Sequence, residues 1–239
     1  MKPVLLIKTG TTIPEIIPAH GDFEQWFAAA VSGARLQQVA VFGGERLPDF
    51  KAVAVAVITG SAAMVSNRED WSETTAEWLR GAVAHDLPIL GVCYGHQLLA
   101  HALGGTVGPN PRGREIGTQE ISCAPAAAED ALFHNHPQRF PAQTTHLETI
   151  LEPPPGAVRL ASSSLDPNAA MRFSSAAWGV QYHPEFSAEV MREYIRRRAK
   201  VLGEEGLDPE ILLAQVKETP VAASVLPAFA KQFSAAWAA

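Results

Sequence analysis

The stretch that decides the fold of this chain is PILGVCYGHQLLA, at residues 88–100. A short apolar run opened by Pro88 ends at Cys93, and leucines at helical spacing follow, which predicts a buried strand, a sharp turn and a helix. Gly91 and Gly95 give the spacing Gly-x-Cys-x-Gly, that of a nucleophile elbow with sulfur in place of the serine hydroxyl. The helix directs free N–H groups and its positive dipole end at the cysteine, which favours the thiolate. From this segment alone, a buried structural cysteine is an equal alternative.

Upstream of this stretch, apolar runs alternate with amphipathic segments. The runs predict strands at residues 4–7, 36–42 and 52–58, and the helical spacings predict helices at residues 22–31 and from about 66 to 85. Ser66 and Glu69 have the spacing of a capping box at the start of the second helix. We therefore expect an α/β fold, with an open, mostly parallel, twisted sheet and helices on both faces.

Downstream, glycines and prolines separate short runs with partial alternation. They predict strands at residues 116–123, 143–150, 157–161, 169–173 and 177–182, as a small antiparallel or mixed extension of the sheet. A helix over residues 187–201 follows, with Ser187 as its N-cap, and its basic cluster at residues 196–200 is interpreted as a solvated face rather than an anion site.

The tail from residue 208 to 239 predicts two further short helices, with Pro220 opening the second. We divide the chain into one domain over residues 1–200 and a C-terminal helical extension over residues 201–239. The extension is expected to pack on the domain, because its leucines and phenylalanines need burial.

Composition excludes several classes of protein. The net charge of −6 and the lack of a long basic run argue against nucleic acid or an anionic membrane as partner. Two cysteines make no disulfide framework, which fits a reducing cytosol. The N-terminal apolar run is too short for a signal peptide, and no apolar stretch reaches the ~20 residues of a membrane span. We expect a cytoplasmic protein.

A second chemical motif, GVQYHPEF, ends the last predicted strand at residues 179–186. Pro184 disfavours helical geometry at His183, and residues two apart in an extended segment point the same way. Glu185 can therefore orient the imidazole of His183. A thiol, a base and an orienting acid form the triad of a cysteine hydrolase, although His183 taken alone is as well explained as a surface histidine.

These two motifs, at residues 91–97 and 179–186, resemble the signature segments of the class I (triad-type) glutamine amidotransferases. ITGS at residues 58–61 resembles the oxyanion loop of that family, and residues 114–117 and 145–150 resemble two weaker family segments. The resemblance spans residues 4 to about 200. It extends to the glutaminase domain of GMP synthase and to γ-glutamyl peptidases, and it implies a flavodoxin-like fold.

The resemblance implies a role for each matching residue. Cys93 attacks the side-chain amide of glutamine to form a γ-glutamyl thioester, His183 carries the proton, and Glu185 holds the imidazole ring. Backbone N–H groups of Tyr94 and of the Gly60–Ser61 loop meet the oxyanion. The residues implied in substrate binding are Ser61, Gln97, Thr145, His146 and Leu147.

The chain departs from the family pattern at several positions. Ser61-Ala62-Ala63 replaces the Gly-Pro of many synthetase-linked members, Glu148 stands where an Asp is common, and Thr118 stands where close relatives often carry an aromatic residue. These departures concern partner contacts and the far end of the substrate.

Other histidines offer weaker alternatives. His96 adjoins the nucleophile but lies on the elbow helix, so His183 is the preferred base. His134 and His136 lack a third ligand at helpful spacing, so no metal is expected. No nucleotide-binding motif is present, and we expect no cofactor.

The leading hypothesis is a hydrolase that cleaves the γ-carboxamide of glutamine, or a γ-glutamyl amide, and releases glutamate with ammonia or an amine. A chain of this size leaves no room for an acceptor site, so the expected partner, if ammonia is used, is a separate ammonia-accepting synthetase subunit. One alternative is a γ-glutamyl peptidase acting on glutathione-like conjugates. Another is a catalytically silent sensor or scaffold.

Overall fold

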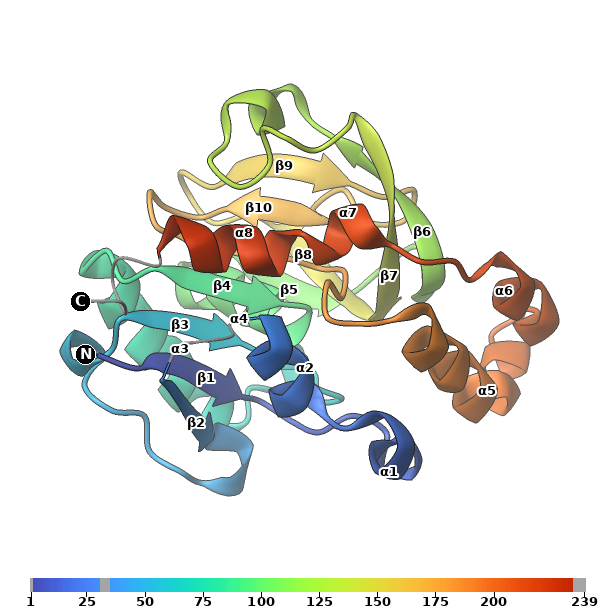
Figure 1. The fold of residues 1–239 in the computed structure, drawn as a ribbon, viewed down its shortest axis with the longest axis horizontal. Helices are drawn as coiled ribbons and strands as arrows, with labels where there is room; N and C mark the ends of the chain where they lie inside the picture. Colours follow the sequence, from blue (N-terminus) through green and yellow to red (C-terminus); the bar gives the residue numbers. More distant parts are fainter. Residues whose placement is uncertain (1, 31–34, 234–239) are drawn as a thin grey trace.

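A single nine-stranded sheet crosses the computed structural model, which describes residues 2–30 and 35–233 (Figure 1). The parallel strands, in sheet order, are β2 (Leu36–Ala40), β1 (Val4–Lys8), β3 (Val55–Ile58), β4 (Ile89–Val92) and β11 (Ala177–Val180). Antiparallel strands continue the sheet, in the order β10 (Ala170–Arg172), β9 (Val158–Ser162), β6 (Glu115–Cys123) and β7 (Arg139–His146). A separate pair is formed by β5 (Thr106–Pro109) and β8 (Glu148–Glu152). The expected α/β fold with an antiparallel extension is confirmed.

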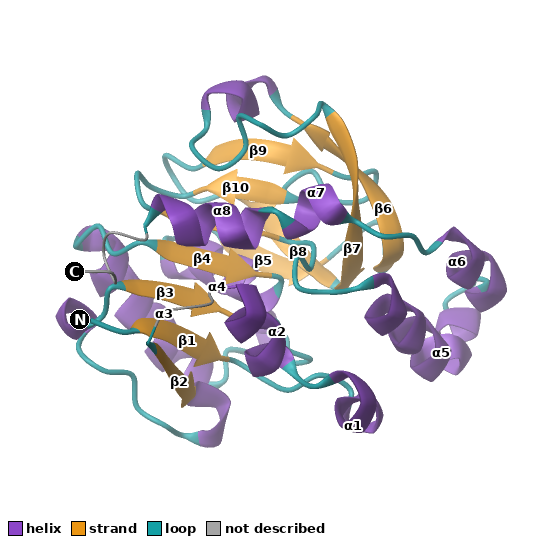
Figure 2. Ribbon diagram, viewed as in Figure 1, coloured by secondary structure: helices purple, strands orange, loops and turns teal. Residues whose placement is uncertain are grey.

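Helices cover both faces of the sheet (Figure 2). The helices are α1 (Ile17–His20), α2 (Phe23–Ala30), α3 (Asp70–Ala84), α4 (Tyr94–Ala102), α5 (Ala188–Glu204), α6 (Pro209–Gln215), α7 (Pro220–Ala223) and α8 (Val225–Gln232). Because side chains alternate along a strand, Val4 and Leu6 of β1 join one apolar core, beneath α2 and α8. Leu5 and Ile7 join a second core beneath α3 and α4, on the opposite face.

The parallel strands bring their carboxyl ends to one edge of the sheet. Ile58 at the end of β3 is in register with Gly91 of β4, and Val92 is in register with Val180 at the end of β11. The loops that follow β1, β3, β4 and β11 therefore meet at this edge, which is where open α/β sheets bind ligands. All the triad candidates lie in these loops.

Several predicted element boundaries were wrong because local turns intervene. The second and third strands are shorter than expected: a 3₁₀ turn at Val41–Gly43 follows the former and another at Phe50–Ala52 precedes the latter. The predicted helix end at Val31 lies outside the described residues. Strand β9 is displaced by one residue from the expected span, and strands β10 and β11 are shorter than theirs.

The predicted capping box at the start of α3 was also wrong. Ser66 lies in a 3₁₀ turn, and Arg68 adopts a left-handed conformation with φ of 55°, so the helix begins only at Asp70. Glu69 is the N-cap residue, without a side-chain capping bond. The N–H of Ser66 instead points to Glu148 Oε2, at 3.3 Å.

The expected strand over residues 143–150 is two strands in two sheets. β7 ends at His146 and β8 begins at Glu148, so Leu147 lies at the break. The segment at the break lies beside Cys93, and both line one hollow.

Up to residue 233, the last residue that the structure describes, the segment after α5 forms three helices rather than two. Ser187 caps α5 as predicted, accepting a hydrogen bond from the N–H of Val190, but the helix runs on to Glu204. Pro220 opens α7, and α8 follows after one residue. Leu226 and Phe229 lie in the same core as β1, and Leu212 of α6 packs against that core. Within the described residues, no helix is long and apolar enough to cross a membrane.

Candidate active site

Cys93 occupies a strained turn between β4 and α4. Its φ of 51° lies in a region that L-residues avoid, and its ψ is −103°. A Cβ atom on Gly91 would collide with the carbonyl oxygen of Gly95, and one on Gly95 would lie 2.7 Å from the carbonyl oxygen of Ile58. Only glycine fits at both positions, so the elbow spacing follows from the close approach of α4 to β4 at Gly91 and to β3 at Gly95. Tyr94 is the first residue of α4, where the backbone N–H has no intrahelical partner.

His183 and Glu185 form a buried pair after β11. His183 Nδ1 lies 2.8 Å from Glu185 Oε1, and both side chains are almost completely shielded from solvent. The imidazole stacks on Phe186, with ring centroids 4.2 Å apart, and the ring of Phe23 lies nearly parallel to both, 6.5 Å from the imidazole centroid. Because Glu185 accepts from Nδ1, the Nε2 atom is free to face the site, and it has no hydrogen-bond partner among the described residues.

Cys93 and His183 meet over Gly60. A Cβ atom at Gly60 would lie 3.0 Å from His183 Cε1 and 3.6 Å from Cys93 Cβ. The two side chains also line one hollow together. The fold therefore brings together a thiol, an imidazole and a carboxylate that are far apart in sequence, which is the arrangement that a cysteine acyl transferase needs.

The environment of His183 favours its protonated form. Burial alone would lower the pKa of the imidazole, but the negative charges of Glu185 and Cys93 outweigh burial and raise the pKa of His183 from 6.5 to about 10. At neutral pH the imidazole is therefore protonated and can give its proton to a leaving group.

The loop after β3 is held by hydroxyl groups. Thr9 Oγ1 and Thr59 Oγ1 both lie within hydrogen-bond distance of the Gly60 carbonyl, at 2.9 and 3.0 Å. In a trans peptide the next N–H points away from that carbonyl, so the N–H of Ser61 is directed away from Thr9. The loop thus has a fixed orientation beside Cys93, as an oxyanion site requires.

A first hollow of about 230 Å³ opens beside Cys93. All five residues that the sequence implied in substrate binding line it: Ser61, Gln97, Thr145, His146 and Leu147. Gln97 Nε2 donates to the carbonyl of Glu148 at 2.7 Å and to Gln181 Oε1 at 3.0 Å. Glu148 also lines the hollow, and its buried Oε1 has no partner in the part of the chain that the structure describes.

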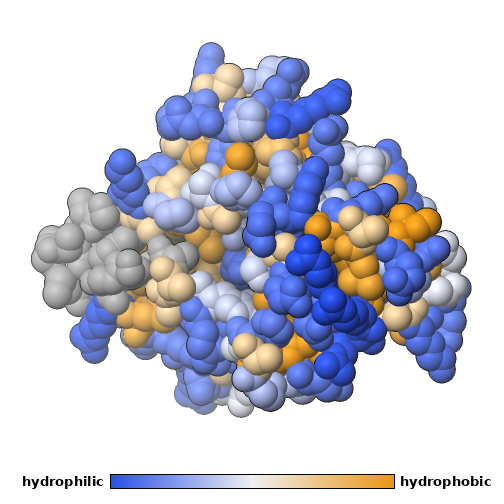
Figure 3. All heavy atoms as spheres, turned by 45° about the vertical axis from the view of Figure 1, so that its right-hand side comes forward, coloured by the Kyte–Doolittle hydropathy of each residue, from blue (hydrophilic) through white to orange (hydrophobic). Residues whose placement is uncertain are grey.

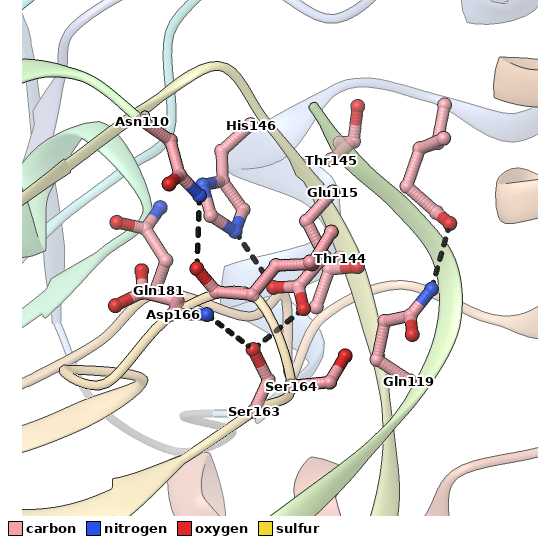
Figure 4. Close-up of polar contacts among 12 residues, drawn as sticks. Asn110, Glu115, Gln119, Thr144, Thr145, His146, Ser163, Ser164, Asp166 and Gln181 are labelled. Atoms are coloured by element: carbon pink, nitrogen blue, oxygen red, sulfur yellow. Dashed lines mark hydrogen bonds and ion pairs between the residues drawn. The ribbon is translucent and has the colours of Figure 1, made fainter. Parts of the chain in front are cut away.

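A buried polar network holds the wall of this hollow (Figure 4). His146 Nε2 lies 2.9 Å from Glu115 Oε2, and Ser163 Oγ donates to the other oxygen of Glu115 at 2.5 Å. Burial alone would lower the pKa of His146, but the hydrogen bond and charge of Glu115 raise it above its usual value. The network fixes the strand end that places the Thr145 carbonyl 3.9 Å from Cys93 Sγ.

A second hollow of about 280 Å³ lies on the His183 side of Cys93. The loop after β1 supplies Thr12 to its lining, and α5 supplies Tyr194 and Arg198. The solvated-face interpretation of the basic cluster was wrong for Arg198, because this side chain is half-buried and lines both hollows. Arg196 and Arg197, by contrast, are exposed and pair with Glu193.

The alternative histidines lie away from the thiol. His96 is fully buried, its Nε2 lies 2.9 Å from the carbonyl of Asn168, and burial lowers its pKa to about 3. It lines neither hollow. His134 and His136 lie beside α7. No cluster of three or more His, Cys, Asp or Glu side chains in residues 2–30 and 35–233 is placed to hold a metal ion.

Three residues of the site, Glu115, Arg198 and Thr12, had no role assigned from the sequence pattern. Glu115 lies within a segment that resembles the family, so the sequence could have marked it as a site residue. Nothing in the sequence showed that it pairs with His146. Arg198 and Thr12 reach the site from distant segments, and no local pattern marks them.

Comparisons with known proteins identify a matching family. The sequence model of the family described as "Glutamine amidotransferase class-I" matches residues 52–201. The glutamine-hydrolysing GMP synthase of Aeropyrum pernix is 37% identical over 142 residues, which are 59% of this chain and 25% of that protein. A protein of Pyrococcus abyssi, named as one subunit of a glutamine-hydrolysing GMP synthase, is 36% identical over 121 residues, which are 50% of this chain and 62% of that protein. The chain thus spans less than two thirds of either relative.

Solved structures share the fold at low identity. A glutamine amidotransferase from Thermotoga maritima superposes with a TM-score of 0.77 at 20% identity, covering 98% of each chain. One from Methylobacillus flagellatus gives a TM-score of 0.73 at 24% identity, covering 100% of this chain and 94% of the other. Both likenesses extend beyond residue 201 and include the C-terminal helices.

Proposed function

Since this chain belongs to the class I glutamine amidotransferase family, we propose that it hydrolyses the γ-amide bond of glutamine or of a γ-glutamyl amine. The observation that carries the proposal is the meeting of Cys93 with the buried His183–Glu185 pair over the Gly60 loop. A silent sensor or scaffold would not need a strained cysteine facing an imidazole of raised pKa.

In the first half of the proposed reaction, the Cys93 thiolate attacks the amide carbon. The N–H groups of Tyr94 and Ser61 stabilise the oxyanion, and His183 Nε2 gives its proton to the leaving nitrogen as the C–N bond breaks. A γ-glutamyl thioester remains on Cys93. Glu185 holds the ring through Nδ1, so that Nε2 faces the leaving group.

In the second half, His183 is neutral and Nε2 removes a proton from water. The water oxygen attacks the thioester carbon, the C–S bond breaks, and glutamate leaves with the thiolate restored. The unpartnered Oε1 of Glu148 in the first hollow would bind the α-ammonium group of the glutamyl moiety throughout.

Incubation of the purified protein with glutamine is expected to release glutamate and ammonia and, after rapid acid quenching, to leave a γ-glutamyl adduct on Cys93. Mass spectrometry of the peptide that contains Cys93 detects the adduct, and a peptide containing Cys123 is the internal control. If glutamine and γ-glutamyl amines all leave Cys93 unmodified, with no product formed, the scaffold alternative replaces this proposal.

The raised pKa of His183 sets the pH dependence of the first half-reaction. A group whose pKa is raised stays protonated until the pH passes the raised value, so kcat/KM should hold through neutral pH and fall as the pH rises through about 10. Glu185→Gln removes one source of the shift and should move this decline to lower pH. Measuring kcat/KM from pH 6 to 11 tests both statements, and an unmoved alkaline limb in the variant would contradict the assignment of His183.

A second use of the same site is the supply of ammonia to a synthetase. Relatives whose names describe one subunit of a GMP synthase favour this use, because such a name implies a separate partner. Val201, which lines the first hollow, is 43% exposed, and Ile211 on α6 is 55% exposed. Figure 3 shows hydrophobic surface on the side of the molecule that carries α5 and α6. We propose this side as the docking face for an ammonia-accepting synthetase.

A further inference from the structure

Arg198 carries a half-buried guanidinium that the protein itself does not neutralise. Its Nε atom is buried and has no hydrogen-bond partner, and no carboxylate within the described residues forms an ion pair with it. Its neighbours on α5 behave differently, because Arg196 and Arg197 both pair with Glu193. A buried cationic group without a partner is typical of a site for an anionic ligand.

Arg198 lines both hollows, and its contacts hold it at the second, on the His183 side of the nucleophile. Its Cζ atom lies 5.2 Å from the centre of the Tyr194 ring, in a cation–π contact. The Tyr194 hydroxyl is held by Thr12 Oγ1 at 2.6 Å, so the ring beneath the cation is anchored. Tyr194 and Thr12 line the second hollow and not the first.

The second hollow is where the leaving amine must lie. The leaving nitrogen takes its proton from His183, and His183 lines this hollow only. Its volume of about 280 Å³ far exceeds the ~30 Å³ that a water-sized molecule such as ammonia occupies. The hollow therefore has room for an amine with a carbon skeleton.

We propose that Arg198 binds the carboxylate of the leaving amine, so that the preferred substrates are γ-glutamyl amides of amino acids or short peptides. The inference rests on the proposed acyl transfer through Cys93 and names the substrate class of that site. Water is consumed, the γ-amide bond is cleaved, and the products are glutamate and a free α-amino acid or peptide.

The test compares two substrates whose leaving amines differ by one carboxylate group. γ-Glutamylglycine carries a carboxylate there, and γ-glutamylmethylamide does not. A charge-assisted hydrogen bond to the buried guanidinium should favour γ-glutamylglycine in kcat/KM by about 10- to 100-fold. In Arg198→Gln this preference should fall to about one, and Arg198→Lys should keep part of it because the charge remains.

Arg197→Gln is the matched control, because Arg197 is the exposed neighbour on the same helix and lines neither hollow. It should keep the preference of the unmodified protein. Equal kcat/KM for the two substrates in the unmodified protein would overturn the inference, even with glutamine hydrolysed, and would favour ammonia as the leaving group. An equal loss for both substrates in Arg198→Gln would also overturn it, by assigning Arg198 to the glutamyl moiety. If no substrate acylates Cys93, the proposed function itself fails and the inference falls with it.

Discussion

Replacing Cys93 with alanine is expected to reduce glutamine or γ-glutamyl amide hydrolysis by at least about 10⁴-fold, because the atom that forms the thioester is lost. The fold should be unaffected. Cys93 already holds a positive φ, and alanine keeps the Cβ atom that this turn accommodates. The measurement is product release at saturating substrate, together with a thermal melting curve for both proteins.

Cys123→Ala is the control for this substitution. Cys123 is the other cysteine of the chain, lies at the end of β6 and lines neither hollow. Its replacement should leave kcat within about twofold. If Cys93→Ala kept more than about 1% of the activity and melted at the same temperature, Cys93 would not be the nucleophile. The proposed acyl transfer would then be contradicted.

The two chemical motifs were predictable because each is local. The close approach of α4 to β4 and β3 demands glycines at fixed spacing around Cys93. The expected extended geometry after His183 was wrong, because residues 183–186 form a turn closed by the Phe186 N–H on the His183 carbonyl, but the carboxylate two positions after the imidazole still reaches it. Short-range sterics impose these patterns, so they are visible in one sequence. The central parallel strands β1 and β3 were equally visible, because strands buried on both faces form nearly continuous apolar runs.

The features that the sequence did not predict depend on contacts between distant segments, which sequence spacing does not encode. Ser66 has a good capping-box partner in sequence, but its N–H is used by Glu148 from a distant strand. Arg198 belongs to a basic cluster that is otherwise solvated, and its place at the site depends on the ring of Tyr194 on the same helix, which Thr12 of a distant loop holds. His146 and Glu115 are joined only by the pairing of β7 with β6. In each case a tertiary contact overrides the local sequence pattern.

Gly91→Ala is expected to destabilise the protein by about 3 kcal/mol or more and to lower its melting temperature by roughly 6–12 °C. The new Cβ atom would collide with the backbone of Gly95 and lie 2.8 Å from the N atom of His96. These are backbone atoms in the first turn of α4, so no side chain can rotate to make room. The helix must shift from the strand, and Cys93, which lies between them, must move away from His183. Activity should therefore fall by about 10²-fold or more even in the fraction that remains folded.

Gly203→Ala provides the matched control, since the same methyl group is added where no atom lies within 4 Å. Gly203 lies in the last turn of α5, so alanine should stabilise the helix by up to about 0.5 kcal/mol and raise the melting temperature slightly. The two variants should thus shift in opposite directions in the same calorimetric experiment. Equal melting temperatures would mean that α4 can move off its strand at little cost, and in that case the strained turn at Cys93 would not be held by the crossing of the two backbones.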